Sequence, residues 1–586
     1  MRMFLNRSEL AVAMRARATE TNYFTYRLFF PLLLLVALLA PLIRIDDIGA
    51  YVNESLYTED LTVFIPQSHE LGIRSLWEPY AGYLFLYNRI IALLARSLPL
   101  AAIPYAFFAA SLMSFTFIAA TLKNRAKDAG LNELQIVFLV CMIALQPNYG
   151  EAFFNLNMSG YFLGIALALH VCIPRRDVTP VSTILFLILT SLTGPFSVFL
   201  IPILALQWSI LRDFSSRKWT YVIVILCGLI QAIFLMQRAT QIPMDTSAAD
   251  WLRAISSFIF FGGSNKLTYV AAIVFWAILL ASFFRWTTTQ RHSRDRVAWL
   301  SPSFSALTAL LLYFAGAVAA QSIAAQNLLS ILSPIDFNSR YFLIPYSLVF
   351  FVALACTQGN KATQTTMVSL ICIICGAGIL SVDRDERASR NEFLSHFNLQ
   401  WTAFVKFREI KPDLLIPVNP PMPIYPPIGR ALKMIGNADS APQTPPNPIL
   451  LDPQQLGASP PATGAGPTIY FDISDYCVTS NYLALEIDIW RSRMGWAIVR
   501  WGRPGHFDSD RSLERFYPDG ASVMQFAFRR DLSDYLIRFD PSDGAEPTQI
   551  INNIREPAAR LGFIVAEATQ PGGDVKIEAV RLFCLN

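Results

Sequence analysis

The chain has few charged residues. Asp, Glu, Lys and Arg together make up 15% of its 586 residues, whereas average globular domains carry about 25%. This deficit, with a mean hydropathy of +0.40, excludes an ordinary soluble enzyme. A formal net charge of only +4, without a long basic stripe, argues against nucleic acid as a partner. Intrinsic disorder is excluded as well, because Phe alone occurs 43 times.

Cysteine is also scarce, and its spacing does not indicate a metal site. Six of the eight cysteines lie in apolar segments, where we expect buried, unreactive thiols. The single CxxC motif has no second copy with which it could bind zinc. Cys477 and Cys584 differ from the others because both lie in the polar C-terminal region. If that region lies outside the cytoplasm, these two residues are free to form a disulfide.

Long apolar runs dominate the first two-thirds of the chain. They have about 16 to 25 residues each, which is the length needed to cross the hydrocarbon core of a bilayer. We therefore predict an α-helical polytopic membrane protein with about eleven transmembrane helices in residues 28–382 and the lipid bilayer as its surroundings. The expected spans are Leu28–Ile43, Leu98–Leu122, Leu134–Pro147, Met158–Ile173, Val181–Thr193, Phe196–Leu211, Thr220–Met236, Leu267–Phe284, Ser303–Ala324, Tyr341–Cys356 and Thr366–Val382.

The distribution of Lys and Arg predicts the orientation. No small-residue cleavage site follows the first apolar run, so we expect an uncleaved helix after the segment 1–27. With this segment in the cytoplasm, the inner segments hold 18 basic residues and the outer loops hold 8, as the positive-inside rule requires. Gly194-Pro195 is interpreted as a turn between two short helices. The polypeptide after Val382 is then predicted to lie outside the cytoplasm.

The composition changes after residue 382. Residues 383–411 are predicted to form an amphipathic helix, and residues 412–467 a Pro-rich linker, because 15 of the 36 prolines fall there. Short alternating runs in residues 468–586 predict an extracytoplasmic β-sandwich of jelly-roll type, in which Cys477 and Cys584 could tie the two ends together. The expected strands are Thr468–Ile473, Tyr482–Trp490, Trp496–Trp501, Ser522–Phe528, Tyr535–Phe539, Phe563–Ala566 and Lys576–Phe583.

The first outer loop, residues 46–99, is the most informative segment. It carries the adjacent carboxylates Glu59 and Asp60, followed by Arg74 and Arg89. A carboxylate can act as general base on an acceptor hydroxyl, and arginine can hold a phosphate leaving group through two parallel hydrogen bonds. Sugar transfer from a lipid phosphate needs both elements. The competing interpretation is that the carboxylates cap a loop helix and that the arginines are interfacial anchors.

Several motifs of this loop resemble a known family. The stretch from Glu59-Asp60 through Ser75-Leu76, Pro79-Tyr80-Ala81-Gly82-Tyr83 and Arg89 is similar to the first extracytoplasmic loop of the GT-C superfamily of integral-membrane glycosyltransferases, in its uncharacterised bacterial branch. The resemblance covers roughly residues 28–382. One departure is Tyr87-Asn88, where a proline is expected closer to Arg89. Weaker similarity lies in Glu151–Asn157, Leu192–Phe196 and Arg340-Tyr341-Phe342.

The resemblance implies an inverting transfer of a sugar from a polyprenyl-phosphate donor to a cell-envelope glycan or lipid-linked acceptor. The reaction would occur on the extracytoplasmic face of the bacterial inner membrane. The resemblance implies Asp60 as the catalytic base, with Glu59 as the next candidate. A divalent cation, Mg²⁺ or Mn²⁺, is compatible with the acidic loops, but their spacing does not demand one. The implied substrate-binding residues are Arg74, Tyr80, Arg89, Glu151, Asn155 and Arg340. Glu151 and Asn155 belong to the second outer loop, residues 147–157, where the alternative is that Glu151 and the asparagines satisfy helix ends.

Two other classes handle similar substrates. An O-antigen or polysaccharide polymerase is expected to carry its main arginine-rich loop in the second half of the chain, whereas the long charged loop here follows the first helix. A flippase or transporter of lipid-linked sugars is expected to place charges within the membrane and to contain an internal repeat. The predicted spans contain almost no charge and no two-fold repeat.

Overall fold

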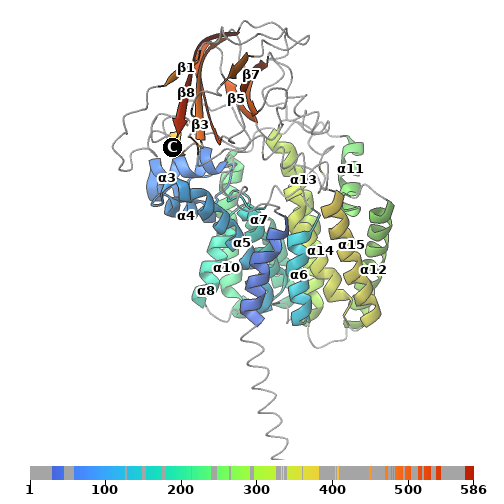
Figure 1. The fold of residues 1–586 in the computed structure, drawn as a ribbon. Coiled ribbons are helices and arrows are strands. Elements are labelled where there is room, and N and C mark those ends of the chain that lie inside the picture. The colour runs from blue at the N-terminus through green and yellow to red at the C-terminus, as the bar shows by residue number, and fades with distance from the viewer. Residues whose placement is uncertain are drawn as a thin grey trace, which may run out of the picture.

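The computed structural model consists of a bundle of helices and two β-sheets (Figure 1). It describes residues 29–44, 59–125, 129–147, 153–174, 180–212, 214–238, 247–262, 266–290, 296–324, 332, 334, 339–358, 360–381, 403, 405–407, 448–451, 469–472, 477, 480, 482–491, 495–502, 512–517, 520–529, 536–542 and 575–585.

Each of the eleven apolar ranges expected to span the membrane contains a helix. Within the described residues, six helices are long and apolar enough to cross a bilayer, namely α5, α10, α12, α13, α14 with its preceding turn, and α15. The helices are Phe29–Arg44, α5 (Ile103–Arg125), α6 (Glu133–Leu145), α7 (Ser159–Cys172), α8 (Pro180–Ser191), α9 (Phe196–Leu211), α10 (Lys218–Arg238), α11 (Ala248–Ile259), α12 (Lys266–Gln290), α13 (Arg296–Ala324), α14 (Leu343–Cys356) and α15 (Lys361–Ser381).

Helices α7 and α14 form the centre of the bundle. Every residue of α14 is buried, and so is every residue of α7 except Tyr161. Such uniformly apolar helices must be surrounded by other helices rather than by one flat surface. Gly164 permits a close approach of α9 and α14, because a methyl group at this position would lie 2.6 Å from the Phe196 ring and 2.8 Å from Ile344. Small residues at such crossings are typical of membrane helices.

The predicted turn at Gly194-Pro195 is present between α8 and α9, and the first outer loop pairs with it. Gly194 has a φ of 90°, and Phe85 forms a β-bridge with Thr193. The side-chain amide of Gln231 on α10 accepts a hydrogen bond from the Leu84 N–H at 2.8 Å and donates to the Leu84 and Gly194 carbonyls at 3.2 and 3.0 Å. Irregular backbone between membrane helices needs such protein partners, because lipid offers none.

The first outer loop has structure of its own. Its elements are η2, one π-helical turn (Asp60–Phe64), α3 (Ile65–Leu71), η3 (Gly72–Trp77) and α4 (Leu86–Ala95), and η4 (Leu100–Ala102) follows the loop. Between η3 and α4, Tyr80 and Tyr83 pair through two backbone hydrogen bonds of 3.0 and 3.1 Å. The residues between them, Ala81 and Gly82, both have positive φ, 55° and 85°. This two-residue turn reverses the chain tightly, and it accounts for the Tyr-Ala-Gly-Tyr motif.

Eight described strands form two four-stranded antiparallel sheets, with the strand orders β1-β8-β3-β6 and β2-β7-β4-β5. The first sheet buries Leu483, Leu485 and Ile487 of β3 on one face. The strands are β1 (Ile449–Leu451), β2 (Ile469–Asp472), β3 (Tyr482–Arg491), β4 (Gly495–Gly502), β5 (Ser512–Tyr517), β6 (Gly520–Arg529), β7 (Leu536–Ser542) and β8 (Val575–Leu585).

The opposite face of this sheet packs toward the helical part. Ala484 and Phe583 lie on that face, and the Phe583 ring lies 5.2 Å from the Phe407 ring. All three residues belong to the same buried apolar cluster as Phe64 and Phe85 of the first outer loop. Figure 1 accordingly shows the sheets at the end of the bundle where α3 and α4 lie. We call the two sheets, β1 to β8, the β-domain. The first outer loop and the β-domain therefore occupy the same end of the helical bundle.

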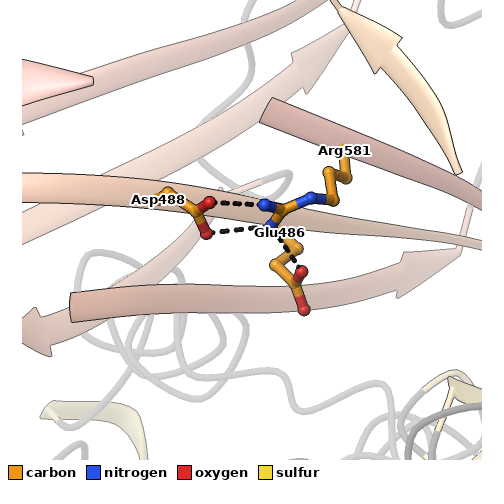
Figure 2. Close-up of polar contacts among 3 residues, drawn as sticks. All are labelled: Glu486, Asp488 and Arg581. Atoms are coloured by element: carbon orange, nitrogen blue, oxygen red, sulfur yellow. Dashed lines mark hydrogen bonds and ion pairs between the residues drawn. The ribbon is translucent and has the colours of Figure 1, made fainter. Parts of the chain in front are cut away.

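The same sheet face carries an ion-pair network (Figure 2). Arg581 on β8 contacts Glu486 at 2.8 Å and Asp488 at 2.9 and 2.5 Å. Glu486 lies directly opposite Arg581, and Asp488 is two residues further along β3. These hydrogen bonds, chiefly those to Asp488, raise the pKa of Arg581. Cys477 and Cys584 form a disulfide across 107 positions, so the pairing considered from the sequence is the one present.

The β-domain differs from the sequence prediction in two places. β1 lies inside the expected linker 412–467, so the sheets begin at Ile449 rather than at residue 468. Its three residues lie between prolines, so the sequence pattern did not indicate a strand there, although the segment pairs with β8. β5 was not predicted either. Most of the predicted amphipathic helix 383–411, most of the linker and the expected strand Phe563–Ala566 lie outside the described residues.

Candidate functional site

Glu59 and Asp60 are the first residues of the first outer loop that the structure describes. Glu59 precedes the π-helical turn, and Asp60 is its first residue. π-Helical turns are rare and are enriched at functional sites. Asp60 is only 1% exposed, which is unusual for a carboxylate. Tyr80, from the tight turn, donates a hydrogen bond of 3.4 Å to Glu59 Oε1. The two adjacent carboxylates thus have different neighbours.

The second outer loop meets the first at Leu156. The Leu156 N–H donates a hydrogen bond of 3.3 Å to Asp60 Oδ2, and the Leu156 carbonyl accepts one from the Asn88 side chain on α4. Asn88 also donates to the Asn157 carbonyl at 3.2 Å. One residue of the second loop therefore connects Asp60 with the start of α4, and these contacts fix the position of the Asp60 carboxylate.

Arg89 follows Asn88 and is 1% exposed. Its guanidinium carbon lies 5.5 Å from the centre of the Phe64 ring, which belongs to the same π-helical turn as Asp60. Nε, Nη1 and Nη2 of Arg89 have no hydrogen-bond partner among the residues that the structure describes. Burial lowers the pKa of Arg89 to about 10, an effect that Glu78 partly opposes. The side chain therefore remains a cation at neutral pH.

Electrostatics distinguish Glu59 from an ordinary surface carboxylate. Burial raises the pKa of Glu59 above its usual value, and the charge of Arg340 and the hydrogen bond from Tyr80 oppose this shift. Arg340 belongs to η7 (Ser339–Phe342), the turn that leads into α14. A turn more than 270 positions later in the chain thus contributes a cation to the surroundings of Glu59.

Several buried polar atoms in this region have no hydrogen-bond partner within the described part of the chain. Hydrogen bonds satisfy the great majority of buried polar atoms in folded proteins, and each unsatisfied one costs about 1–3 kcal/mol. A group of them in one region, including a full guanidinium, is typical of a site that receives a polar ligand. Among the described residues these atoms include Glu59 Oε2, Asn88 Oδ1, Asn157 Oδ1 and the three Arg89 nitrogens.

The structure brings together most, but not all, of the residues expected at the site. Glu59 interacts with Tyr80 and Arg340. Asn155 is 9% exposed, and its side chain accepts a hydrogen bond of 2.8 Å from the Met158 N–H. This contact is the helix-capping alternative considered from the sequence. Glu151 lies outside the described residues.

Arg74 is separate from this group. It lies on η3 and is exposed, whereas Arg89 is buried beside Phe64. The sequence pattern predicts the same role for both arginines, since a one-dimensional pattern does not show which face of a loop element turns inward. Of the two, Arg89 has the surroundings of a ligand-binding cation.

The structure adds Asn88 to the candidate site and brings in Asn157, which the sequence indicated only as one of the asparagines in the stretch Glu151–Asn157. Asn88 precedes Arg89 within an otherwise apolar helix, and a polar pair in such a helix commonly points into the protein. Just before this part of the second loop, Phe154 has a φ of 68°. Left-handed backbone costs a non-glycine residue about 1 kcal/mol or more. Strain of this kind often accompanies functional loops.

Metal binding has little support in the described part of the chain, where no group of three or more His, Cys, Asp or Glu side chains is positioned to hold a metal ion. The acidic residues Glu59 and Asp60 with the cations Arg89 and Arg340 favour an organic ligand that has both hydroxyl groups and a negative charge. No protein-family model matches the chain, and a search of curated proteins gives no match.

Proposed function

We propose that this protein is a membrane glycosyltransferase of the GT-C type. It transfers a sugar from a polyprenyl-phosphate donor to a cell-envelope glycan or a lipid-linked acceptor. The observation that carries the proposal is the buried guanidinium of Arg89, which has no hydrogen-bond partner among the described residues and lies against the turn that begins with Asp60. A general base and a phosphate-binding cation are the two elements that such a transfer needs.

The reaction is a single displacement with inversion. The Asp60 carboxylate accepts the proton of the acceptor hydroxyl while the hydroxyl oxygen attacks the anomeric carbon. The bond between that carbon and the phosphate oxygen breaks, and the electron pair leaves with the polyprenyl phosphate. Arg89, with Arg340 near Glu59, stabilises the charge that develops on the phosphate. Arg74 has no part in this scheme because it is exposed on η3.

Glu59 and the amide side chains recognise the sugar. Tyr80 already donates a hydrogen bond to Glu59 Oε1, and Glu59 Oε2 is buried without a partner in the described region, so we assign this carboxyl to hydrogen bonding with the sugar. Asn88 Oδ1 and Asn157 Oδ1, which are buried without a partner in the described region, accept hydrogen bonds from sugar hydroxyls. Adjacent carboxylates with different surroundings are suited to different roles.

The proposal extends to the topology. Eleven crossings of the bacterial inner membrane, with residues 1–27 in the cytoplasm, leave the first outer loop and the β-domain on the extracytoplasmic side. Their position at one end of the bundle supports this arrangement. A jelly-roll β-domain is supported by the pairings β1–β8, β2–β7, β3–β6 and β4–β5, because a long antiparallel ribbon that wraps into two sheets pairs its strands in this nested order.

Mass spectrometry of lipid-linked and surface glycans, in cells with and without this protein, tests the proposal. Loss of a single sugar from an otherwise complete glycan is the expected result, and Asp60→Asn should reproduce it. Accumulation of single repeat units would instead indicate a polymerase. Accumulation of complete intermediates on the inner leaflet would indicate a flippase. Either of these outcomes would contradict the proposed transfer.

A further inference from the structure

The outer surface of the first outer loop carries large apolar side chains. Ile73 and Trp77 on η3 are 72% and 59% exposed, and Leu94 at the end of α4 and Leu98 just beyond it are 63% and 41% exposed. We call these four residues the loop patch. Isolated exposed apolar residues are common, but a contiguous group marks an interaction surface.

The two segments that carry the loop patch are adjacent. Arg96, between Leu94 and Leu98, directs its Nη1 toward the Ser68 carbonyl at 3.5 Å. A methyl group at Gly72 would lie 3.7 Å from the same Nη1, and Gly72 directly precedes Ile73. The end of α4 and the start of η3 therefore lie side by side.

Helix α4 has the polarity of a lipid-facing helix. Its polar residues Asn88 and Arg89 are 0% and 1% exposed, whereas Leu94 is 63% exposed. A helix on the surface of a water-soluble domain shows the opposite arrangement. Polar groups directed inward and apolar groups directed outward are expected where the surroundings are hydrocarbon.

The chain after the loop patch continues directly into a candidate membrane span. Helix α5 is apolar and long enough to cross the bilayer, and its Tyr105 and Met113 are 50% and 54% exposed. The patch is thus continuous along the chain with a lipid-facing surface. Two exposed cations, Arg74 and Arg96, lie among its residues, as expected at the level of lipid phosphates.

We infer that the loop patch is immersed in the interfacial region of the bilayer, with Ile73, Trp77, Leu94 and Leu98 against lipid. The lipid that contacts the patch belongs to the leaflet at the end of the bundle where the β-domain lies. Trp is the side chain most typical of this depth. Because Asn88 and Arg89 lie on the inward side of the same helix, the candidate site lies at the height of the lipid headgroups. This inference does not depend on the proposed reaction.

Photo-crosslinking of the full-length protein in nanodiscs of phosphatidylethanolamine and phosphatidylglycerol tests the inference. One lipid probe carries its diazirine next to the headgroup, and the other carries it at the end of an acyl chain. The two carbenes lie roughly 15 Å apart along the bilayer normal, half the thickness of the hydrocarbon core. The residues that are labelled are identified by mass spectrometry, with the middle of α12 and strand β3 as internal references.

The headgroup probe should label the loop patch about tenfold more than the acyl-end probe, given the separation of the two carbenes. The middle of α12 should show the reverse preference, and β3 should remain unlabelled by both. The variant Ile73→Ser/Trp77→Ser should lose label at the patch while α12 keeps its own. Labelling of the patch no higher than that of β3 would overturn the inference. So would crosslinks from the patch to a second copy of the chain in place of lipid.

Discussion

The carboxylate of Asp60 accepts a hydrogen bond from the backbone N–H of Leu156, 96 positions later in the chain. The Leu156 carbonyl accepts in turn from Asn88, the neighbour of Arg89. The two outer loops therefore hold the proposed base and the proposed phosphate-binding arginine in one structure. Asp60 is almost completely buried, so its position does not depend on a flexible surface side chain.

Replacement of Asp60 by Asn should abolish sugar transfer without unfolding the protein. The amide oxygen of Asn can still accept the Leu156 N–H, whereas it cannot take a proton from an acceptor hydroxyl. We expect a loss of about 100-fold or more in rate, the usual contribution of a general base. Glycan analysis measures the activity, and a thermal melt in detergent measures the fold. Glu70→Gln, an exposed position in the same loop, is the matched control and should retain activity.

The two arginines of the first loop should differ in importance. Arg89→Lys loses the planar fork that binds a phosphate through two hydrogen bonds, and we expect about a tenfold or greater loss of transfer. Arg74→Lys, at the exposed position on η3, should remain within about twofold of the wild type, as surface substitutions usually do. Parallel measurement of both variants provides the comparison. An equal effect at the two positions would contradict the site described above.

The stability of the protein should depend on the protonation of Glu59. Burial raises the pKa of this carboxyl above 4.5, so the folded protein retains a proton that the unfolded chain has already released. The stabilising contribution is complete below pH 4.5 and is lost as the pH rises through the folded-state pKa. Thermal melts at increasing pH should therefore show a wild-type decline that Glu59→Gln lacks. Parallel curves for the two proteins would contradict the burial of a titrating carboxyl.

Gln231 should be important for stability although it has no role in the proposed reaction. Its amide interacts with Leu84 and Gly194 at the break between α8 and α9. Among the described residues, Gln231→Leu removes the partner of the Leu84 N–H and of the Gly194 carbonyl, at a cost of about 2 kcal/mol or more. Gln237→Leu, at an exposed position on the same helix, is the control. Thermal melts in detergent should separate the variants, and equal melting temperatures would contradict the assigned role of Gln231.

The disulfide between Cys477 and Cys584 should stabilise the β-domain. It closes a loop of 107 positions, for which the loss of chain entropy corresponds to roughly 5 kcal/mol. Reduction, or the double variant Cys477→Ser/Cys584→Ser, should increase proteolysis of the β-domain and leave the apolar helices protected. Intact-mass analysis before and after alkylation establishes whether the bond is present. A free thiol at either residue in the native protein would contradict the pairing.

Much of the helical part could be predicted from the sequence. Apolar runs determine where helices form, and Gly194-Pro195 determines where one must end, because proline removes a backbone donor. The partner of that break could not be predicted. Gln231 and Leu84 lie 147 positions apart, and no local pattern connects an amide on one helix with a loop residue.

The site was predictable only in part. Residue type and position indicated Asp60, Glu59 and Arg89 as chemically capable residues. The burial of Arg89 and the exposure of Arg74 distinguish the candidate phosphate-binding residue from the surface residue. Burial depends on the packing of η3 and α4 rather than on their composition. Short elements were the least predictable, since β1 has three residues between prolines. The packing of Phe583 against Phe407 depends on tertiary structure alone.

The most direct test of the account uses purified full-length protein in nanodiscs with a panel of polyprenyl-phosphate sugars and lipid extract from cells that lack the protein. Mass spectrometry follows the release of free polyprenyl phosphate. The account predicts release from at least one donor by the wild type and none by Asp60→Asn. Release at the wild-type rate by both Asp60→Asn and Glu59→Gln would contradict it.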